Sequence, residues 1–106
     1  MPHGEMKLDY SSEAQDDLWR IGAYIVEQGG YGSSAKGVVS AIQDDADRLI
    51  DHPFLGFDVK FRIPVETDYR MLVSGDYHIF YRLEGQSIIV IRILHGSQDW
   101  MTILFK

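Results

Sequence analysis

The sequence of 106 residues contains no cysteine, which excludes disulfide bonds and thiolate metal ligands. It also lacks an excess of basic residues, because ten Lys and Arg stand against sixteen Asp and Glu and the net charge is −6. Tight binding of naked nucleic acid usually needs a basic field, since phosphate contacts supply most of the affinity. We therefore expect no direct, sequence-specific DNA binding by this chain alone.

Long apolar runs and ligand motifs are missing as well. No run approaches the 18 residues of a membrane helix, and no charged-then-apolar start with a small-residue cleavage site is present. With the lack of cysteine, these patterns predict a cytoplasmic protein without a membrane partner. The histidines, His3, His52, His78 and His95, show no metal-ligand spacing, and no phosphate-cradling glycine motif occurs. We expect neither a metal ion nor a cofactor.

What is present predicts one globular domain. Apolar residues make up 45% and charged residues 25% of the chain, as in ordinary soluble proteins. Residues 1–5 precede a natural-looking start at Met6 and are interpreted as an expression scar or an upstream extension, which leaves a single domain over 6–106. The acidity is uneven, because residues 1–53 have a net charge of −6 whereas residues 54–106 are neutral.

The first half predicts a strand followed by a helical hairpin. Residues Lys7 to Tyr10 alternate polar and apolar side chains, as a short strand does. Ser12 and Gln15 match a capping box, and the helix they begin should end at Gly29 and Gly30. Its apolar face would comprise Ala14, Leu18, Ile21 and Ile25. A second helix would present Ala35, Val38, Val39, Ile42, Ala46 and Leu49 and end before Pro53.

The second half predicts a sheet. After a short edge strand at Lys60 to Ile63, three strands are expected at 69–74, 77–83 and 87–95. Gly75-Asp76 suits a two-residue turn, and residues 84–86 suit a three-residue loop. With these turns, the face toward the helices would comprise Arg70, Leu72, Ile79, Tyr81, Ile89, Ile91, Ile93 and His95. The opposite face, solvated or in contact with an acidic partner, would comprise Met71, Val73, His78, Phe80, Arg82, Val90, Arg92 and Leu94.

These elements define an α+β fold of order β-α-α-β-β-β. The N-terminal helical hairpin would pack on one face of a twisted antiparallel sheet. A short apolar C-terminal tail over residues 99–106 would either pack back on the sheet or dock a partner.

The C-terminal strands contain a recognisable motif. Residues 69–82 and 91–99 resemble the RelE/ParE superfamily, the toxins of type II toxin–antitoxin modules, and match the ParE or plasmid stabilisation branch more closely. The matching positions are Arg70, Gly75, Tyr77, Ile79, Tyr81, Arg82, Arg92, Leu94, His95, Gly96 and Asp99. One position departs from the pattern, because Gln98 stands where an arginine is usual.

The resemblance implies a toxin that inhibits DNA gyrase by binding, without an enzymatic reaction of its own, and that a cognate antitoxin neutralises. Its motif or target-contact residues would be Arg70, Arg82, Arg92, His95, Gln98, Asp99 and Trp100. The acidic helices predict a basic antitoxin segment by charge complementarity.

Two alternatives stay open. A RelE-like chain would cleave messenger RNA on the ribosome with the catalytic set Arg70, His78, Tyr81, Arg92 and His95. The cationic positions of RelE-like members fall near Arg70, Leu72, His78 and Gln98, and of these Arg70 alone has a permanent charge. The other alternative is a degenerate family member without toxicity.

Overall fold

A computed structural model of the chain describes residues 5–105, apart from the side chain of Ser33. Apart from Glu5, the extension predicted at residues 1–5 lies outside the described residues. The elements are β1 (Lys7–Tyr10), α1 (Ser12–Glu27), α2 (Gly32–Asp47), η1 (Arg48–Ile50), β2 (Phe57–Asp58), η2 (Val59–Phe61), β3 (Arg70–Ser74), β4 (Tyr77–Glu84), β5 (Ser87–His95) and α3 (Trp100–Leu104). Within the described part of the chain, no helix is long and apolar enough to cross a membrane.

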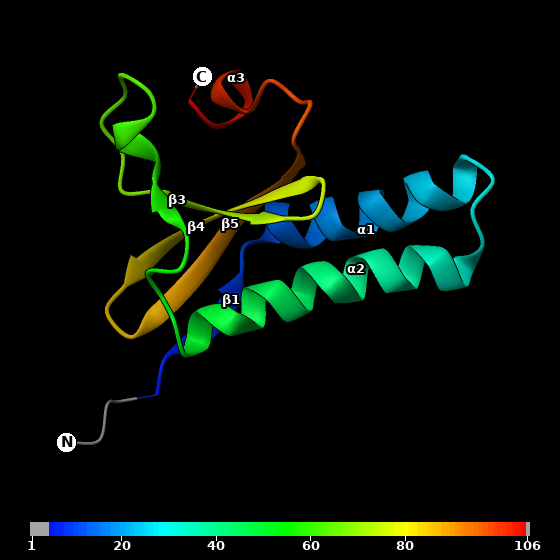
Figure 1. Cartoon of the computed structure of the whole chain (residues 1–106), viewed down its shortest axis with the longest axis horizontal. Coiled ribbons are helices and arrows are strands. Elements are labelled where there is room, and N and C mark those ends of the chain that lie inside the picture. Colours follow the sequence, from blue (N-terminus) through cyan, green and yellow to red (C-terminus); the bar gives the residue numbers. More distant parts are fainter. Residues whose placement is uncertain (1–4, 106) are drawn as a thin grey trace.

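The two long helices begin and end where local chemistry allows. Ser11 caps α1, because its hydroxyl accepts the Ala14 N–H at 3.0 Å, so the cap predicted at Ser12 is wrong by one residue. The helix ends before Gly29, whose φ of 87° lies in the left-handed region that favours glycine. In Figure 1, α1 and α2 lie side by side on one side of the sheet, and their connected ends extend beyond it.

The predicted α+β class and element order are confirmed. The sheet order is β1-β5-β4-β3-β2, and the three C-terminal strands pair antiparallel as expected. The sheet is mixed, because β1, the first strand in the sequence, pairs parallel with β5, the last one. The edge strand predicted at Lys60 to Ile63 is wrong: the strand is the shorter β2, and residues 59–61 form the 3₁₀ turn η2.

The register of β5 differs from the prediction in its first half. Glu84 pairs with Ser87, so the turn has two residues, with Gly85 at φ 59°, where three were predicted. This shift turns Ile88 and Val90, rather than Ile89, toward the helices. A bulge between the pairs of Phe80 and Tyr81 then restores the predicted face for Ile93 and His95.

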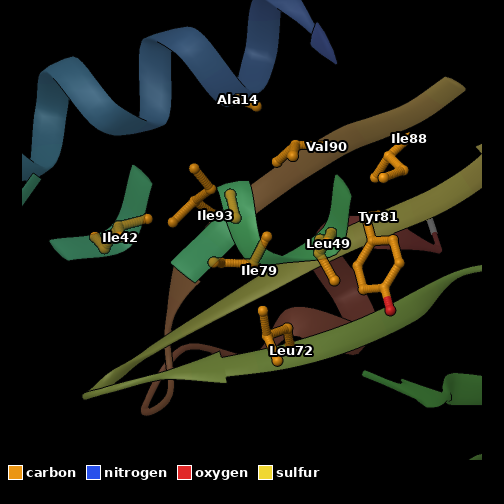
Figure 2. Close-up of a cluster of buried hydrophobic side chains, with 10 residues drawn as sticks. Ala14, Ile42, Leu49, Leu72, Ile79, Tyr81, Ile88, Val90 and Ile93 are labelled. Carbon is orange, nitrogen blue, oxygen red and sulfur yellow. The ribbon is translucent and has the colours of Figure 1, made fainter. Parts of the chain in front are cut away.

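The main core lies between the helical hairpin and the sheet. Its buried members include side chains from α1, α2, η1 and all three long strands, shown in Figure 2: Ala14, Ile42, Leu49, Leu72, Ile79, Tyr81, Ile88, Val90 and Ile93. Tyr81 is the largest of these, and its hydroxyl points away from Ile88 at the margin of the cluster. Burial of these side chains is the main source of stability.

The opposite face of the sheet is covered at its centre, which corrects the expectation of a solvated or contact face there. Phe80 and Leu94 are buried beneath the C-terminal segment, and the Trp100 ring lies tilted against the Phe80 ring with the centroids 5.3 Å apart. The helix α3 lies on this side, away from α1 and α2 (Figure 1). Of the two predictions for the tail, packing back on the sheet is the one observed.

Candidate functional site

The predicted site residues separate into two groups. Those of the first group have hydrogen-bond or ion-pair partners within the fold. Tyr81 is fully buried, and its hydroxyl donates to the Pro53 carbonyl at 2.9 Å and accepts the Gly56 N–H at 3.0 Å. Arg70 donates from Nε to the same hydroxyl at 3.3 Å. This hydroxyl therefore ties the loop ahead of β2 to the edge of the core.

Arg70 has its remaining donors engaged in the same loop. Its guanidinium lies 2.9 Å from Asp58 Oδ1 and donates to the carbonyl oxygens of Phe54 and Gly56. The side chain is only 13% exposed. Gly56 is required here, since an added Cβ would lie 2.5 Å from the Met71 carbonyl oxygen. We name Arg70, Tyr81, Asp58 and the backbone of residues 53–56 the Arg70–Tyr81 cluster.

Arg92 is also engaged. Its Nε and a terminal nitrogen donate to the two carboxylate oxygens of Asp17 at 2.7 and 2.9 Å, a bidentate pair between β5 and α1. Asp17 is only 5% exposed and also accepts the Ile93 N–H at 2.9 Å. The hydrogen bonds that Arg92 donates to Asp17 raise the pKa of Arg92, which keeps the guanidinium charged. This pair joins the helices to an edge of β5 that β1 does not reach.

Three further predicted residues have local partners. Arg82 forms an ion pair with Glu84 on its own strand. Asp99 caps α3 by accepting hydrogen bonds from Thr102, one from the backbone and one from the hydroxyl. Trp100 is half-buried against Phe80. The geometry assigns each of these side chains a role in local folding.

His78 lies beneath the turn that follows β5. A Cβ added to Gly96 would lie 3.2 Å from its Nε2, so the two pack closely. Burial first, and then the nearby His95, lower the pKa of His78. Its Nδ1 is buried and has no hydrogen-bond partner among the described residues. His78 is thus a neutral side chain at neutral pH. It packs against Gly96 of the turn.

The second group lies in the exposed turn after β5. The His95 N–H donates to Gln98 Oε1 at 2.8 Å, and the Ser97 N–H donates to His95 Nδ1 at 3.1 Å. Neutral His95 therefore bears its ring hydrogen on Nε2, and the amide NH₂ of Gln98 remains available as a donor. The turn orders both side chains without engaging their outward donors.

These two side chains line a pocket of about 390 Å³ between α1 and the end of β5. We name it the α1–β5 pocket, and its lining residues are Arg20, Ile21, Tyr24, Tyr77, His95, Ser97 and Gln98. The rings of Tyr77 and His95 meet edge to face at 5.3 Å. Burial, followed by the charges of Asp76 and Tyr24, raises the pKa of Tyr77. The pocket holds phenols, an imidazole, an amide and a guanidinium.

Sequence reasoning missed Arg20, Tyr24 and Tyr77 as members of this site. Arg20 and Tyr24 are four residues apart on one side of α1, a spacing that places side chains together. No local signal connects them with residue 95, because that contact depends on how α1 lies across β5. Among residues 5–105, no three His, Asp or Glu side chains gather so as to hold a metal ion.

Comparison with known proteins identifies the class that this fold and motif define. The family model described as the ParE toxin of the type II toxin–antitoxin system parDE matches residues 8–100. The chain therefore belongs to the ParE toxin family, within the RelE/ParE superfamily of toxins. No match was found among curated proteins.

Solved structures share the fold at low sequence identity. A chain of the chromosomal ParDE system from P. aeruginosa superposes with a TM-score of 0.71 at 23% identity, over 86% of this chain and 96% of that chain. A chain of the RelBE2 toxin–antitoxin complex from Mycobacterium tuberculosis gives 0.62 at 16% identity, over 87% and 99%. A chain of the RelB–RelE complex from Methanococcus jannaschii gives 0.51 at 19% identity, over 92% and 99%.

Proposed function

We propose that this toxin acts by binding DNA gyrase and that a cognate antitoxin holds it inactive. The chain belongs to the ParE family, and the resemblance of its C-terminal motif to that branch implies gyrase as the target. One observation favours binding over catalysis. Arg70 and Arg92, the arginines that a RelE-like nuclease mechanism would need, are held in ion pairs with Asp58 and Asp17.

The pairing matters because a ribonuclease needs free cations. Such an enzyme must stabilise negative charge that develops on a phosphate in the transition state. Arg92 donates to a buried carboxylate, and Arg70 donates to Tyr81, to Asp58 and to two carbonyls. Releasing Arg92 would leave the buried Asp17 carboxylate without its cation, at a cost of several kcal/mol. The chain's net charge of −6 further disfavours approach to ribosomal RNA.

The antitoxin fits the outer groove between α1 and α2. This groove has a volume of about 730 Å³ and is lined by small and apolar side chains such as Gly22, Ala23 and Val39. Trp19 is 74% exposed at its side, and Val26 is 49% exposed. An amphipathic antitoxin helix would bury these side chains, and the structural relatives from ParDE and RelBE systems are consistent with such a partner.

The charge of the N-terminal half, which contains α1 and α2, predicts the composition of the antitoxin's docking segment. Residues 1–53 have a net charge of −6, so Lys and Arg should flank the apolar face of the docking segment. Replacing Val39 by Asp should weaken antitoxin binding at least tenfold, whereas replacing the exposed Ser40 by Asp should leave it unchanged. Equal affinity of both variants would refute the groove as the docking site.

Inducible expression in bacteria tests the target. We expect filamentous cells, an SOS response and continuing protein synthesis, together with inhibition of gyrase supercoiling by the purified chain. An immediate block of translation with cleaved messages would instead support the RelE-like endonuclease. Normal growth at high expression would support a non-toxic family member. Co-expression of the antitoxin is the control in each case.

A further inference from the structure

The α1–β5 pocket differs from its surroundings in chemistry. The chain has six more acidic than basic groups, yet no carboxylate lines this pocket among the residues that the structure describes. Its polar lining consists of the Arg20 guanidinium, the His95 imidazole, the Gln98 amide, the Ser97 hydroxyl and two phenols. A guanidinium, an imidazole N–H and an amide NH₂ in a concave site without a carboxylate suit the recognition of an anion.

Two of these donors are already oriented. The Gln98 carbonyl oxygen is occupied by the His95 N–H, so the side chain offers its NH₂ group. The Nδ1 atom of His95 accepts the Ser97 N–H, so the imidazole offers Nε2–H. A site whose donors are held by neighbouring hydrogen bonds loses less entropy when a ligand binds.

Arg20 supplies the charge. It is exposed on α1 and forms no ion pair with any described residue, in contrast to Arg70 and Arg92. Its guanidinium can present two parallel N–H groups to a phosphate. A phosphate monoester offers three acceptor oxygens, enough for Arg20, His95 and Gln98 together, whereas a carboxylate offers two.

The aromatic lining adds a second requirement. Tyr24 is 59% exposed and lies one helical turn from Arg20, while Tyr77 forms another wall beside His95. Exposed tyrosine rings next to phosphate donors are typical of sites that stack a flat base. The volume of about 390 Å³ lies within the usual range for small-molecule pockets. A long nucleic acid is disfavoured by the chain's net charge of −6.

We propose that the α1–β5 pocket binds a small phosphate monoester that carries a flat ring, of the nucleoside monophosphate class. Arg20, His95 and Gln98 bind the phosphate, and Tyr24 and Tyr77 contact the ring. This site does not depend on gyrase as the target, and its occupancy is measured on the purified chain without any toxicity readout.

The test is a titration of the full chain with AMP, followed by NMR or calorimetry. We expect saturable binding of AMP, with adenosine and inorganic phosphate each at least tenfold weaker, about 1.4 kcal/mol. Arg20→Gln should weaken AMP binding at least tenfold. The matched control is Arg48→Gln, since Arg48 is 59% exposed at the end of α2 and lies outside the pocket lining. Circular dichroism verifies that both variants fold.

A second variant separates the two parts of the ligand. Tyr24→Leu should weaken AMP binding and leave the weak binding of inorganic phosphate unchanged, because only the ring contact is lost. Failure of AMP to saturate the chain would overturn the proposal, as would equal effects of Arg20→Gln and Arg48→Gln. Binding of a short acidic peptide in place of AMP would overturn it in favour of a protein partner.

Discussion

The Arg70–Tyr81 cluster and the α1–β5 pocket contain similar side chains and use them differently. The cluster combines an arginine with one tyrosine hydroxyl, and the pocket combines an arginine with two. In the cluster, the loop of residues 53–58 supplies carbonyls and a carboxylate that satisfy the donors. In the pocket Arg20 is exposed and forms no ion pair with any residue that the structure describes. Available acceptors, rather than residue type, decide whether an arginine is structural or free to bind.

The comparison also bears on the family motif. Arg70, Tyr81 and Arg92 belong to the motif, yet here they join a loop or a helix to the sheet. His95 belongs to it too and remains exposed, as does Gln98, which stands where the motif usually has an arginine. The family motif therefore contains residues that hold the fold together as well as residues that remain exposed, and the accessibility of each side chain separates the two groups.

The largest expected effect concerns the closed Asp17–Arg92 pair. Asp17→Ala should lower the free energy of unfolding by about 3 to 5 kcal/mol, because it leaves a charged guanidinium and the Ile93 N–H without their buried acceptor. Asp16→Ala on the exposed side of α1 is the control and should change stability by about 0.5 kcal/mol or less. Urea denaturation measures both, and similar losses would contradict a structural role for the pair.

The next effect concerns the buried phenol. Tyr81→Phe should cost about 1 to 3 kcal/mol, since the Gly56 N–H and the Pro53 carbonyl lose their partner inside the protein. Tyr24→Phe, at an exposed phenol, should cost about 0.5 kcal/mol or less. Thermal unfolding of the two variants provides the comparison, and equal melting temperatures would show that the cluster does not hold the loop.

A smaller change in stability is expected at Gln98 in the α1–β5 pocket. Gln98→Ala removes one acceptor for the His95 N–H and should cost about 0.5 to 1 kcal/mol. If the exposed turn contacts the target, the same variant should restore colony counts at least tenfold during expression. Gln86→Ala, in the exposed turn before β5, is the matched control. Undiminished toxicity of a folded Gln98→Ala chain would remove Gln98 from the contact surface.

The last effect is a pH dependence on the helix side of the sheet. Burial, and then the charge of Asp47, raises the pKa of Tyr10 from 10.0 to about 12. Between these values the folded chain retains a proton that the unfolded chain has lost, so stability falls as pH rises through this interval. Tyr10→Phe should make the decline shallower. Denaturation midpoints at pH 9 and about 11 measure it, and parallel curves would contradict the burial of this hydroxyl.

Much of the fold could be predicted because its signals are local. The apolar periodicity of both helices, the glycines at 29 and 75 and the alternation along the strands depend on neighbouring residues. The errors arose where two neighbouring alternatives, for a capping residue or a turn length, differ little in local energy. The helix cap moved from Ser12 to Ser11, and the turn before Ser87 lost one residue, since either alternative suits the sequence.

The sequence by itself determined the α+β class, the helical hairpin, the three-strand meander and the family motif, because each is built from helices and strands whose periodicity is visible within about 20 residues. Tertiary structure decided the rest. It placed β1 parallel to β5, inserted the bulge beside Phe80, and folded the tail over Leu94. It also engaged Arg92 with an aspartate 75 residues earlier while it left Arg20 unpaired among the described residues. Long-range acceptors have no signature in the local sequence, and here they separate Arg70 and Arg92, which are engaged in the fold, from the exposed Arg20.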